Sequence, residues 1–335
     1  MNLNNKTILV TGGTGSFGKS FIDQIIKKHK NIKKLIIFSR DELKQFNLSK
    51  QYNGEKYKFL RFFIGDVRDY KRLDWALKEV DIVIHAAALK QVPAAEYNPI
   101  EAIKTNIMGA QNVIEASLNN NVQKVIALST DKASSPINLY GATKLCSDKL
   151  FIAANNFKGR KKISFSVVRY GNIFGSRGSV IHSFLSQKKK DNILKITDPA
   201  MTRFLLSVEE GVNLVIWSLS NSFGGEIIVP KIPSIRIIDV AKIVAPKSKI
   251  NVVGIRPGEK LHEELISIHE SRNCFNYKNN YLILDPLNYK LSDFYKRKGA
   301  KIVEDNFSYD SFSNKKYLSK QQFMKLYKNL IIHIK

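Results

Sequence analysis

The sequence predicts an α/β fold in which a smaller lobe is interwoven with a doubly wound parallel sheet. Two observations carry this prediction. Short runs rich in Val, Ile, Leu and Phe alternate with longer helical patterns, which is typical of consecutive βαβ units. The first apolar run, residues 7–11, leads directly into a glycine-rich turn and a helix, as at the start of a Rossmann-like sheet.

The predicted elements follow one another with short connections. We expect strands at residues 7–11, 35–39, 59–64, 82–86, 124–128, 165–168 and 226–229. Helices are expected to begin near Ser16, Asp41, Asp69, Pro99 and Asn138. Near the end of the chain, Ser319 and Gln322 have the spacing of a capping box, which predicts a last helix through about residue 332.

The alternation of strands and helices weakens after Gly171, where Gly, Ser, Pro and charged residues are more frequent. No Pro/Gly/Ser-rich linker indicates a tethered second domain. The sequence therefore predicts a Rossmann-like domain of residues 1–174 plus about 205–232. A smaller substrate-binding lobe with a C-terminal extension is expected from about 175–204 plus 233–335.

The composition is that of a chain able to build a sizeable core, with 44% hydrophobic residues. No apolar run reaches the roughly 18 to 20 residues that span a bilayer, and residues 1–6 lack signal-peptide features. Cys146 and Cys274 are the two cysteines, so no disulfide framework is implied. We therefore expect a cytoplasmic protein with no membrane partner.

The net charge of +25 raises the question of a nucleic-acid partner. The lysines are spread along the chain, however, and their short clusters are not interleaved with aromatic residues as in a base-stacking surface. We therefore expect no nucleic-acid partner and a surface that attracts small anionic substrates. A polyanion partner is the alternative.

The glycine-rich turn, residues 12–18 (GGTGSFG), predicts a dinucleotide site. Glycines at the end of a first strand let backbone N–H groups approach a pyrophosphate at a helix N-terminus. The motif is weak alone, but here it lies in the required strand–turn–helix context. The residues of the turn expected to contact the cofactor are Gly12, Thr14, Gly15, Ser16, Phe17 and Gly18.

The end of the second predicted strand favours NADP over NAD. A site that prefers NAD places a carboxylate there to hold the ribose hydroxyls. This chain has Ser39 and Arg40, two donors that suit a 2′-phosphate, while the nearby Asp41 keeps NAD as the alternative. After the third strand, Asp66 and Val67 could hold the adenine, and the small Ala86 and Ala88 follow the fourth. His85 is expected to be a buried strand residue.

Residues 129–144 hold two pairs of reactive side chains. Tyr140 and Lys144 are four residues apart, so they share one face of a helix. Using a tyrosine as a base near neutral pH requires its pKa to fall by about three units, or about 4 kcal/mol, which nearby positive charge favours. Asp131 and Lys132 form an acid–base couple at the end of an apolar strand. The first pair predicts oxidation of an alcohol, and the second predicts an elimination that follows it.

Together with Asn106 and the alanines after the fourth strand, these motifs resemble the extended short-chain dehydrogenase/reductase family over about residues 5–265. Longer stretches resemble, within it, the inverting UDP-N-acetylglucosamine 4,6-dehydratases of pseudaminic acid synthesis for flagellin or surface glycosylation. These stretches are residues 38–44 (FSRDELK), 89–99 (LKQVPAAEYNP), 129–144, 169–172 (RYGN) and 256–260 (RPGEK). Gln91 and the pair Ser134 and Ser135 depart from the family pattern.

The resemblance implies a role for each reactive side chain. Tyr140, with Lys144, takes the proton of the sugar 4-hydroxyl while NADP accepts the hydride. Lys132 then removes the C5 proton, Asp131 assists the departing C6 hydroxyl, and Thr130 polarises the C4 oxygen. Hydride returns to C6, which gives UDP-2-acetamido-2,6-dideoxy-β-L-arabino-hexos-4-ulose and regenerates a tightly bound cofactor. For Lys132 to act as a base its pKa has to be depressed, and we expect burial beside Lys144 to do so.

The resemblance also implies further cofactor and substrate contacts. The cofactor is expected to touch Lys44, Lys90, Ser129, Tyr140, Lys144 and Ile173. UDP-N-acetylglucosamine is expected to touch Lys90, Asn172, Arg177, Val180, Thr197, Met201, Arg203, Arg256 and Glu259. Of these, Arg203 and Arg256 would neutralise its diphosphate. No metal is expected, since His262, Glu263 and Glu264 lack the H-E-x-x-H spacing. A homo-oligomer is the family expectation.

Three other functions stay open at this point. A UDP-sugar 4-epimerase of the same fold needs only Tyr140, Lys144 and room for the keto sugar to turn over, and Asp131 with Lys132 argues against it. A non-catalytic dinucleotide-sensing protein, or a basic RNA binder, has no need of the tyrosine–lysine pair.

Overall fold

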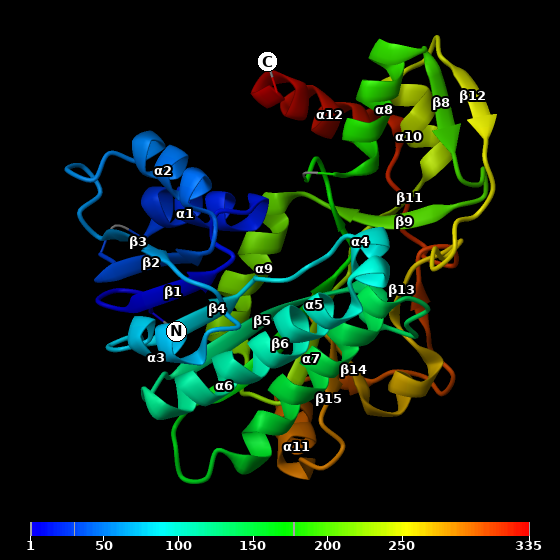
Figure 1. Cartoon of the computed structure of the whole chain (residues 1–335). Helices are drawn as coiled ribbons and strands as arrows, with labels where there is room; N and C mark the ends of the chain where they lie inside the picture. Colours follow the sequence, from blue (N-terminus) through cyan, green and yellow to red (C-terminus); the bar gives the residue numbers. More distant parts are fainter. Residues whose placement is uncertain (1, 30, 177, 335) are drawn as a thin grey trace.

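The computed structural model describes residues 2–29, 31–176 and 178–334, and its centre is a mostly parallel sheet (Figure 1). Seven strands run parallel in the order β3-β2-β1-β4-β5-β6-β10. Each predicted strand is present, with ends shifted by at most two residues, which confirms the predicted fold class. The bounds are β1 Thr7–Thr11, β2 Lys34–Ser39, β3 Leu60–Ile64, β4 Ile82–His85, β5 Lys124–Thr130, β6 Ser164–Tyr170 and β10 Glu226–Pro230.

Helices cover both faces of this sheet. On one face α1 (Ser16–Lys28) packs against α9 (Val208–Asn221), and on the other α6 (Gly109–Asn119) packs between α3 (Tyr70–Ala76) and α7 (Leu139–Phe157). The remaining helical segments of this part are α2 (Glu42–Gln51), α4 (Val92–Tyr97), α5 (Pro99–Ile103), the π-helical η1 (Lys104–Met108) and the 3₁₀ turn η2 (Asp131–Ala133).

The predicted helix starts are confirmed, and side-chain caps explain three of them. The carboxylates of Asp41 and Asp69 accept hydrogen bonds from the third backbone N–H of α2 and of α3. Asn138 accepts from the N–H of Gly141, 2.8 Å away, and so begins α7 one residue before the predicted tyrosine. These short polar residues satisfy N–H groups that have no partner within the helix.

A second, smaller core lies in the lobe at the upper right of Figure 1. It contains a sheet of β11 (Ser234–Arg236), β9 (Thr202–Leu206) and β7 (Asn172–Ile173), and a ladder of β8 (Ile193–Ile196) with β12 (Lys249–Val252). Helices α8 (Val180–Lys190), α10 (Ile237–Val244) and α12 (Lys320–Ile334) enclose them. The predicted capping box is present at α12, where Ser319 and Gln322 exchange hydrogen bonds of 2.9 and 3.2 Å.

The C-terminal segment differs from the predicted division, because most of residues 264–310 join the main sheet and its core. The hairpin β14 (Cys274–Tyr277) and β15 (Asn280–Leu284) adds antiparallel strands beyond β10, followed by β16 (Lys301–Ile302). The hairpin pairs the backbone groups of β10, which would otherwise form a free sheet edge. Between and around them lie β13 (Glu264–Ile266), η3 (Ile268–Asn273), α11 (Tyr289–Arg297) and β17 (Tyr309–Asp310).

Arg169 of β6 ties this extension to helix α7, and its side chain is fully buried. Its guanidinium lies 3.4 Å from the Asp148 carboxylate of α7 and 2.9 Å from Glu270 of η3, and it donates to the carbonyl oxygen of Leu265 at 3.1 Å. Asp148 also accepts from the Ser129 hydroxyl at 2.7 Å.

Within the described residues, no helix is long and apolar enough to cross a bilayer.

We predict that Arg169→Met lowers the free energy of unfolding by about 3–5 kcal/mol, because it leaves the buried Asp148 carboxylate and the partly buried Glu270 carboxylate without their cation. Urea denaturation measures this loss. The control is Arg297→Met, since Arg297 is exposed and only contacts a backbone carbonyl of its own helix. The control is expected within about 0.5 kcal/mol of the unmodified protein. Equal stability of both variants would contradict the structural role of Arg169.

Candidate active site

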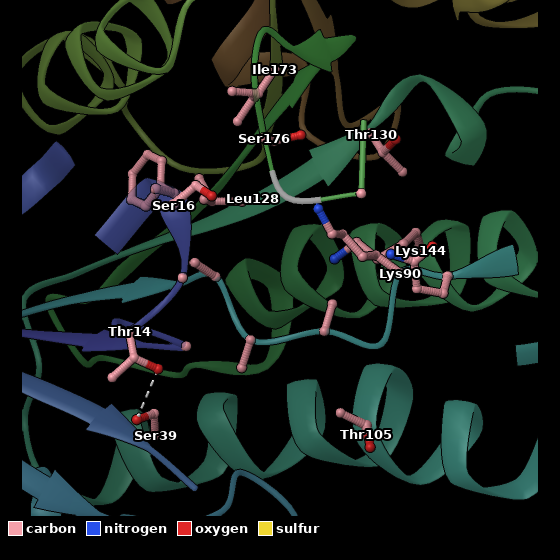
Figure 2. A pocket seen from close by; sticks show the side chains of 18 of the residues that line it. Thr14, Ser16, Ser39, Lys90, Thr105, Leu128, Thr130, Lys144, Ile173 and Ser176 are labelled. Atoms are coloured by element: carbon pink, nitrogen blue, oxygen red, sulfur yellow. Dashed lines mark hydrogen bonds between the residues drawn. The ribbon is translucent and has the colours of Figure 1, made fainter. Parts of the chain in front are cut away.

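A cavity of about 660 Å³ opens at the carboxyl ends of the parallel strands. It lies where β1 has β2 on one side and β4 on the other, so that the strand order reverses. Open α/β sheets bind ligands at this position. Figure 2 shows its two ends, with Thr14 and Ser39 at one and Thr130 and Lys144 at the other.

Most residues predicted to touch the cofactor line this cavity. They are Gly12, Thr14, Gly15, Ser16, Phe17, Ser39, Arg40, Asp41, Lys44, Asp66, Val67, Ala86, Ala88, Lys90, Ser129, Tyr140, Lys144 and Ile173. Gly18 is the exception. A Cβ on Gly18 would lie 2.0 Å from the carbonyl oxygen of Gly13, so this glycine lets helix α1 pack against the turn.

Gly12 shapes the floor of the cavity. Its φ of +64° is in the left-handed region, and a Cβ there would lie 2.9 Å from the backbone nitrogen and Cα of Ala87. The turn and the segment after β4 therefore approach each other backbone to backbone. This cradle fits the pyrophosphate of a dinucleotide, because the turn lines the cavity and leads into the N-terminus of α1.

The segment after β4 is fixed by Asn106, which lies in the π-helical turn η1. The Asn106 amide accepts from the backbone N–H of Leu89 at 2.8 Å and donates to the Leu89 carbonyl at 2.9 Å. It also donates to the Thr143 hydroxyl of α7 at 3.0 Å. Asn106 therefore links the cavity wall to helix α7. π-Helical turns are frequent at functional sites.

His85, at the end of β4, is a buried core residue as predicted. Burial, with a smaller effect from the Lys144 charge, lowers its pKa to about 3, so the ring is neutral. Its Nδ1 contacts the Thr11 hydroxyl at 2.9 Å. The cavity is lined by the alanines that follow it and not by His85 itself.

At the end near β2, charged side chains pair with one another around the cavity mouth. Arg40 is half exposed and lies 3.6 Å from Asp66. The Asp41 carboxylate caps α2 and forms an ion pair with Lys44. Ser39 is buried, and its hydroxyl accepts from Thr14 at 3.3 Å and from the Gln45 amide at 3.1 Å (Figure 2). Arg40 and Lys44 are therefore the cations of this end that line the cavity.

Tyr140 and Lys144 lie on the face of α7 that lines the other end of the cavity. Burial raises the pKa of Tyr140 to about 12, although the charge of Lys132 and a hydrogen bond with Thr130 oppose the rise. Burial lowers the pKa of Lys144, and attraction to Asp148 partly offsets this. In the part of the chain that the structure describes, the Lys144 amine has no hydrogen-bond partner, so its donors can serve a ligand.

The predicted acid–base couple lies at the end of β5, beside the tyrosine. Lys132 Nζ is 3.1 Å from Asp131 Oδ1, and the Thr130 hydroxyl donates to the same oxygen at 2.8 Å. Thr130 and Lys132 line the cavity, whereas Asp131 lies behind them with 1% of its side chain exposed. Burial raises the pKa of Asp131, against the effect of Lys132.

The prediction of a depressed Lys132 pKa is wrong for this arrangement. Burial alone would lower it, but the carboxylates of Asp131 and Glu263 outweigh burial and raise the pKa of Lys132. Glu263 lies 3.1 Å from Lys132 Nζ and comes from a segment 131 residues further along the chain. Sequence reasoning considered Glu263 only as part of a failed metal motif. Its position three residues after the RPGEK stretch is the available sequence signal, and it does not indicate a lysine partner.

The predicted substrate residues fall into two groups. Lys90 and Asn172 line the cavity, Val180 starts helix α8 next to the cavity residue Ser179, and Arg177 lies outside the described residues. The others do not line it. Thr197 and Met201 are buried in the lobe. Arg203 forms ion pairs with Glu259 at 3.7 Å and with Glu263 at 3.6 Å. Arg256 forms an ion pair with Glu259 at 3.0 Å.

Several lining residues were not predicted individually. They are Phe38, Gly65, Ala87, Gln91, Thr105, Leu128, Tyr170, Gly171, Ser176, Gly178 and Ser179. Three of them, Ser176, Gly178 and Ser179, are sequence neighbours of the predicted substrate residues Arg177 and Val180. Among the described residues, no group of His, Cys, Asp and Glu could hold a metal ion.

We predict that Gly12→Ala weakens NADPH binding at least tenfold, which corresponds to about 1.4 kcal/mol. The new methyl group would push the backbone at Ala87 away from the turn. Gly159→Ala is the matched control, because Gly159 has a φ of +60° but no atom within 4 Å of the added Cβ. Fluorescence titration measures both affinities. Equal weakening in the two variants would show that backbone strain, and not the close approach, is responsible.

Comparisons with known proteins agree with this geometry. Residues 8–285 match the family model described as polysaccharide biosynthesis protein. A UDP-N-acetylglucosamine 4,6-dehydratase (inverting) of Campylobacter jejuni subsp. jejuni serotype O:23/36 (strain 81-176) is 51% identical over 330 residues, which cover 96% of this chain and 97% of the relative. A UDP-glucose 4-epimerase of Rickettsia bellii (strain OSU 85-389) is 44% identical, over 97% of this chain and 96% of the relative.

A solved structure shows the same fold over nearly the whole chain. Pen from Bacillus thuringiensis superposes with a TM-score of 0.88 at 36% sequence identity, covering 98% of this chain and 100% of the other. The family match spans the cofactor turn, the acid–base couple and most of the sheet. The chain therefore belongs to the polysaccharide biosynthesis protein family, together with the inverting UDP-N-acetylglucosamine 4,6-dehydratases.

Proposed function

We propose that the protein catalyses the NADP-dependent, inverting 4,6-dehydration of UDP-N-acetylglucosamine to UDP-2-acetamido-2,6-dideoxy-β-L-arabino-hexos-4-ulose. One observation carries this proposal: Lys132, with the Asp131 carboxylate directly behind it, lies at the same end of one cavity as the redox pair Tyr140 and Lys144. The relative from Campylobacter jejuni, which carries the name of this activity, supports the choice of substrate.

The oxidation step requires a base at the sugar 4-hydroxyl. Tyr140 would remove this proton, and Lys144 lowers the cost of the phenolate by its positive charge. A nicotinamide dinucleotide held by residues 12–18 would accept hydride from C4 and later return it to C6. The burial that raises the pKa of Tyr140 to about 12 makes this positive charge necessary. The free donors of Lys144 are available to hydrogen-bond the ligand.

The elimination step uses the second pair. The new C4 ketone makes the C5–H bond acidic, because the carbanion delocalises onto the carbonyl. Lys132 would take the C5 proton, a C5–C6 double bond would form, and the C6 hydroxyl would leave as water with a proton from Asp131. Before this step the Lys132 amine has to be neutral and the Asp131 carboxyl protonated. Transfer of one proton from Lys132 Nζ to Asp131 Oδ1, which are 3.1 Å apart, produces this state. Inversion at C5 then requires reprotonation on the face opposite Lys132.

The finer parts of the proposal rest on local charge and on the family resemblance. Arg40 and Lys44 beside Ser39 support NADP over NAD, because two cations at this end of the cavity suit a 2′-phosphate. The family resemblance supports a homo-oligomer in the cytoplasm. It also supports a place at the first step of pseudaminic acid synthesis for flagellin or surface glycosylation.

A 4-epimerase is the second candidate, because the Rickettsia bellii relative carries that name. Epimerisation needs Tyr140 and Lys144 but no group that removes a C5 proton. The arrangement of Lys132 at the cavity, with a buried carboxylate behind it, favours dehydration.

We predict that incubation with UDP-N-acetylglucosamine in deuterated water yields a 4-keto-6-deoxy sugar that carries deuterium at C5 and has the L-arabino configuration. Proton NMR of the product measures this outcome. Lys132→Ala is expected to abolish the product while NADPH binding persists, because the C5 base is lost. A simple 4-epimer, or product formation by Lys132→Ala near the unmodified rate, would contradict the proposal.

We predict that Arg40→Ala weakens NADP⁺ binding at least tenfold, since a charge-assisted contact is worth about 1.5–3 kcal/mol. NAD⁺ binding is expected to change less than about twofold, because it lacks the 2′-phosphate. Arg61→Ala is the control, since Arg61 lies on the neighbouring strand β3 and outside the cavity. Calorimetric titration of protein freed of dinucleotide measures all four constants. Equal weakening for both dinucleotides would count against the NADP assignment.

A further inference from the structure

Among the described residues, Glu263 forms an ion pair with Lys132 but has no role in the proposed mechanism. Its Oε1 lies 3.1 Å from Lys132 Nζ and 3.6 Å from Arg203 Nε. Its side chain is 3% exposed. A buried carboxylate beside a lysine that opens onto the cavity is therefore part of the same charge cluster.

The backbone of Glu263 is fixed independently of Lys132. Its N–H donates to the Ser311 hydroxyl at 2.9 Å, and its carbonyl accepts from the Ser311 N–H at 2.7 Å. The following residues form β13, which pairs with β17. The chain on either side also holds the loop after β5, because Lys260 donates to the Ser134 carbonyl at 2.7 Å and Glu264 accepts from the Ser135 hydroxyl at 2.6 Å.

Two buried oxygens of this cluster have no hydrogen-bond partner among the described residues: Glu263 Oε2 and Asp131 Oδ2. A buried carboxylate oxygen without a partner is costly, and buried polar atoms in proteins are rarely left unsatisfied without a functional reason. Here both oxygens belong to carboxylates that contact the same amine. Lys132 thus contacts two carboxylates, one more than a single ion pair requires, and Arg203 shares the second of them.

We propose that Glu263 is a positioning residue for dehydration, which fixes the Lys132 amine at the cavity and supplies the negative charge that faces it when it takes the C5 proton. This inference rests on the proposed function. In the elimination, the C5–H electrons form the C5–C6 double bond, the C5 proton moves to Lys132, and the C6 oxygen leaves as water with the proton of Asp131. The step therefore turns a neutral pair into Asp131⁻ and Lys132⁺ beside Glu263⁻.

The pH dependence of Lys132 is set by groups from its own turn, from β9, from α7 and from the segment before β13. These groups are Asp131, Arg203, Tyr140, Lys260 and Glu263. Replacing Glu263 by Gln keeps a hydrogen-bond acceptor for the amine but removes one negative charge. The pKa of Lys132 then falls, so the amine becomes neutral at a lower pH.

The test is Glu263→Gln in the full chain. We expect kcat for UDP-N-acetylglucosamine to fall about tenfold, with KM changed less than about twofold. The limb of the pH–rate profile that reports ionisation of Lys132 is expected to move to a pH about one unit lower. Glu263→Asp keeps the charge, so its limb is expected to stay closer to that of the unmodified protein. Glu264→Gln removes a neighbouring carboxylate that contacts Ser134 and Ser135, and its limb is expected not to move.

A second readout does not depend on turnover. Competitive acylation with acetic anhydride, followed by mass spectrometry of the peptide that contains Lys132, measures the pH at which this amine becomes reactive. The midpoint is expected to be lower in Glu263→Gln than in the unmodified protein and in Glu264→Gln. An unchanged midpoint would overturn the role of Glu263 even if the protein dehydrates the sugar. A lowered midpoint in a protein that makes no 4-keto-6-deoxy product would support the Glu263–Lys132 coupling and refute the proposed function alone.

Discussion

The Lys132 ammonium group lies between Asp131 at the end of β5 and Glu263 before β13, 3.1 Å from each carboxylate. Removing either partner would leave buried charge uncompensated, so this contact constrains both parts of the chain that supply it. The end of β5 has to stay at the cavity, and the C-terminal segment has to fold back over it. The pairing of β13 with β17 and the buried Arg169 hold that segment in place.

The parallel sheet explains why oxidation and elimination can share one cavity. The carboxyl ends of β1, β4 and β5 meet at one edge, so the cofactor turn, the alanine segment and the acid–base couple converge there. The short connection from Thr130 to Tyr140 then places α7 beside the couple. Asn106 adds the remaining constraint, because it links the alanine segment to α7 through Leu89 and Thr143.

Features encoded in neighbouring residues could be predicted from the sequence. The apolar runs, the helix caps at Asp41, Asp69 and Asn138, and the glycine turn are local patterns, and the structure has them where they were expected. The hairpin of β14 and β15 was missed, because its attachment to β10 depends on pairing across about 50 residues. The pKa of Lys132 was predicted with the wrong sign, because the adjacent Asp131 raises it and the distant Glu263 adds to that rise, so that together they outweigh burial.

In the proposed mechanism Tyr140 and Lys144 perform the redox step, whereas Lys132 performs a separate elimination. Stopped-flow absorbance of Lys132→Ala, loaded with oxidised cofactor and mixed with UDP-N-acetylglucosamine, separates the two steps. We expect the near-ultraviolet absorbance of reduced nicotinamide to rise and persist, because C4 is oxidised and the reaction stops before water is lost. No rise in Lys132→Ala, alongside a transient rise in the unmodified protein, would contradict it, since Lys132 would then be needed for oxidation itself.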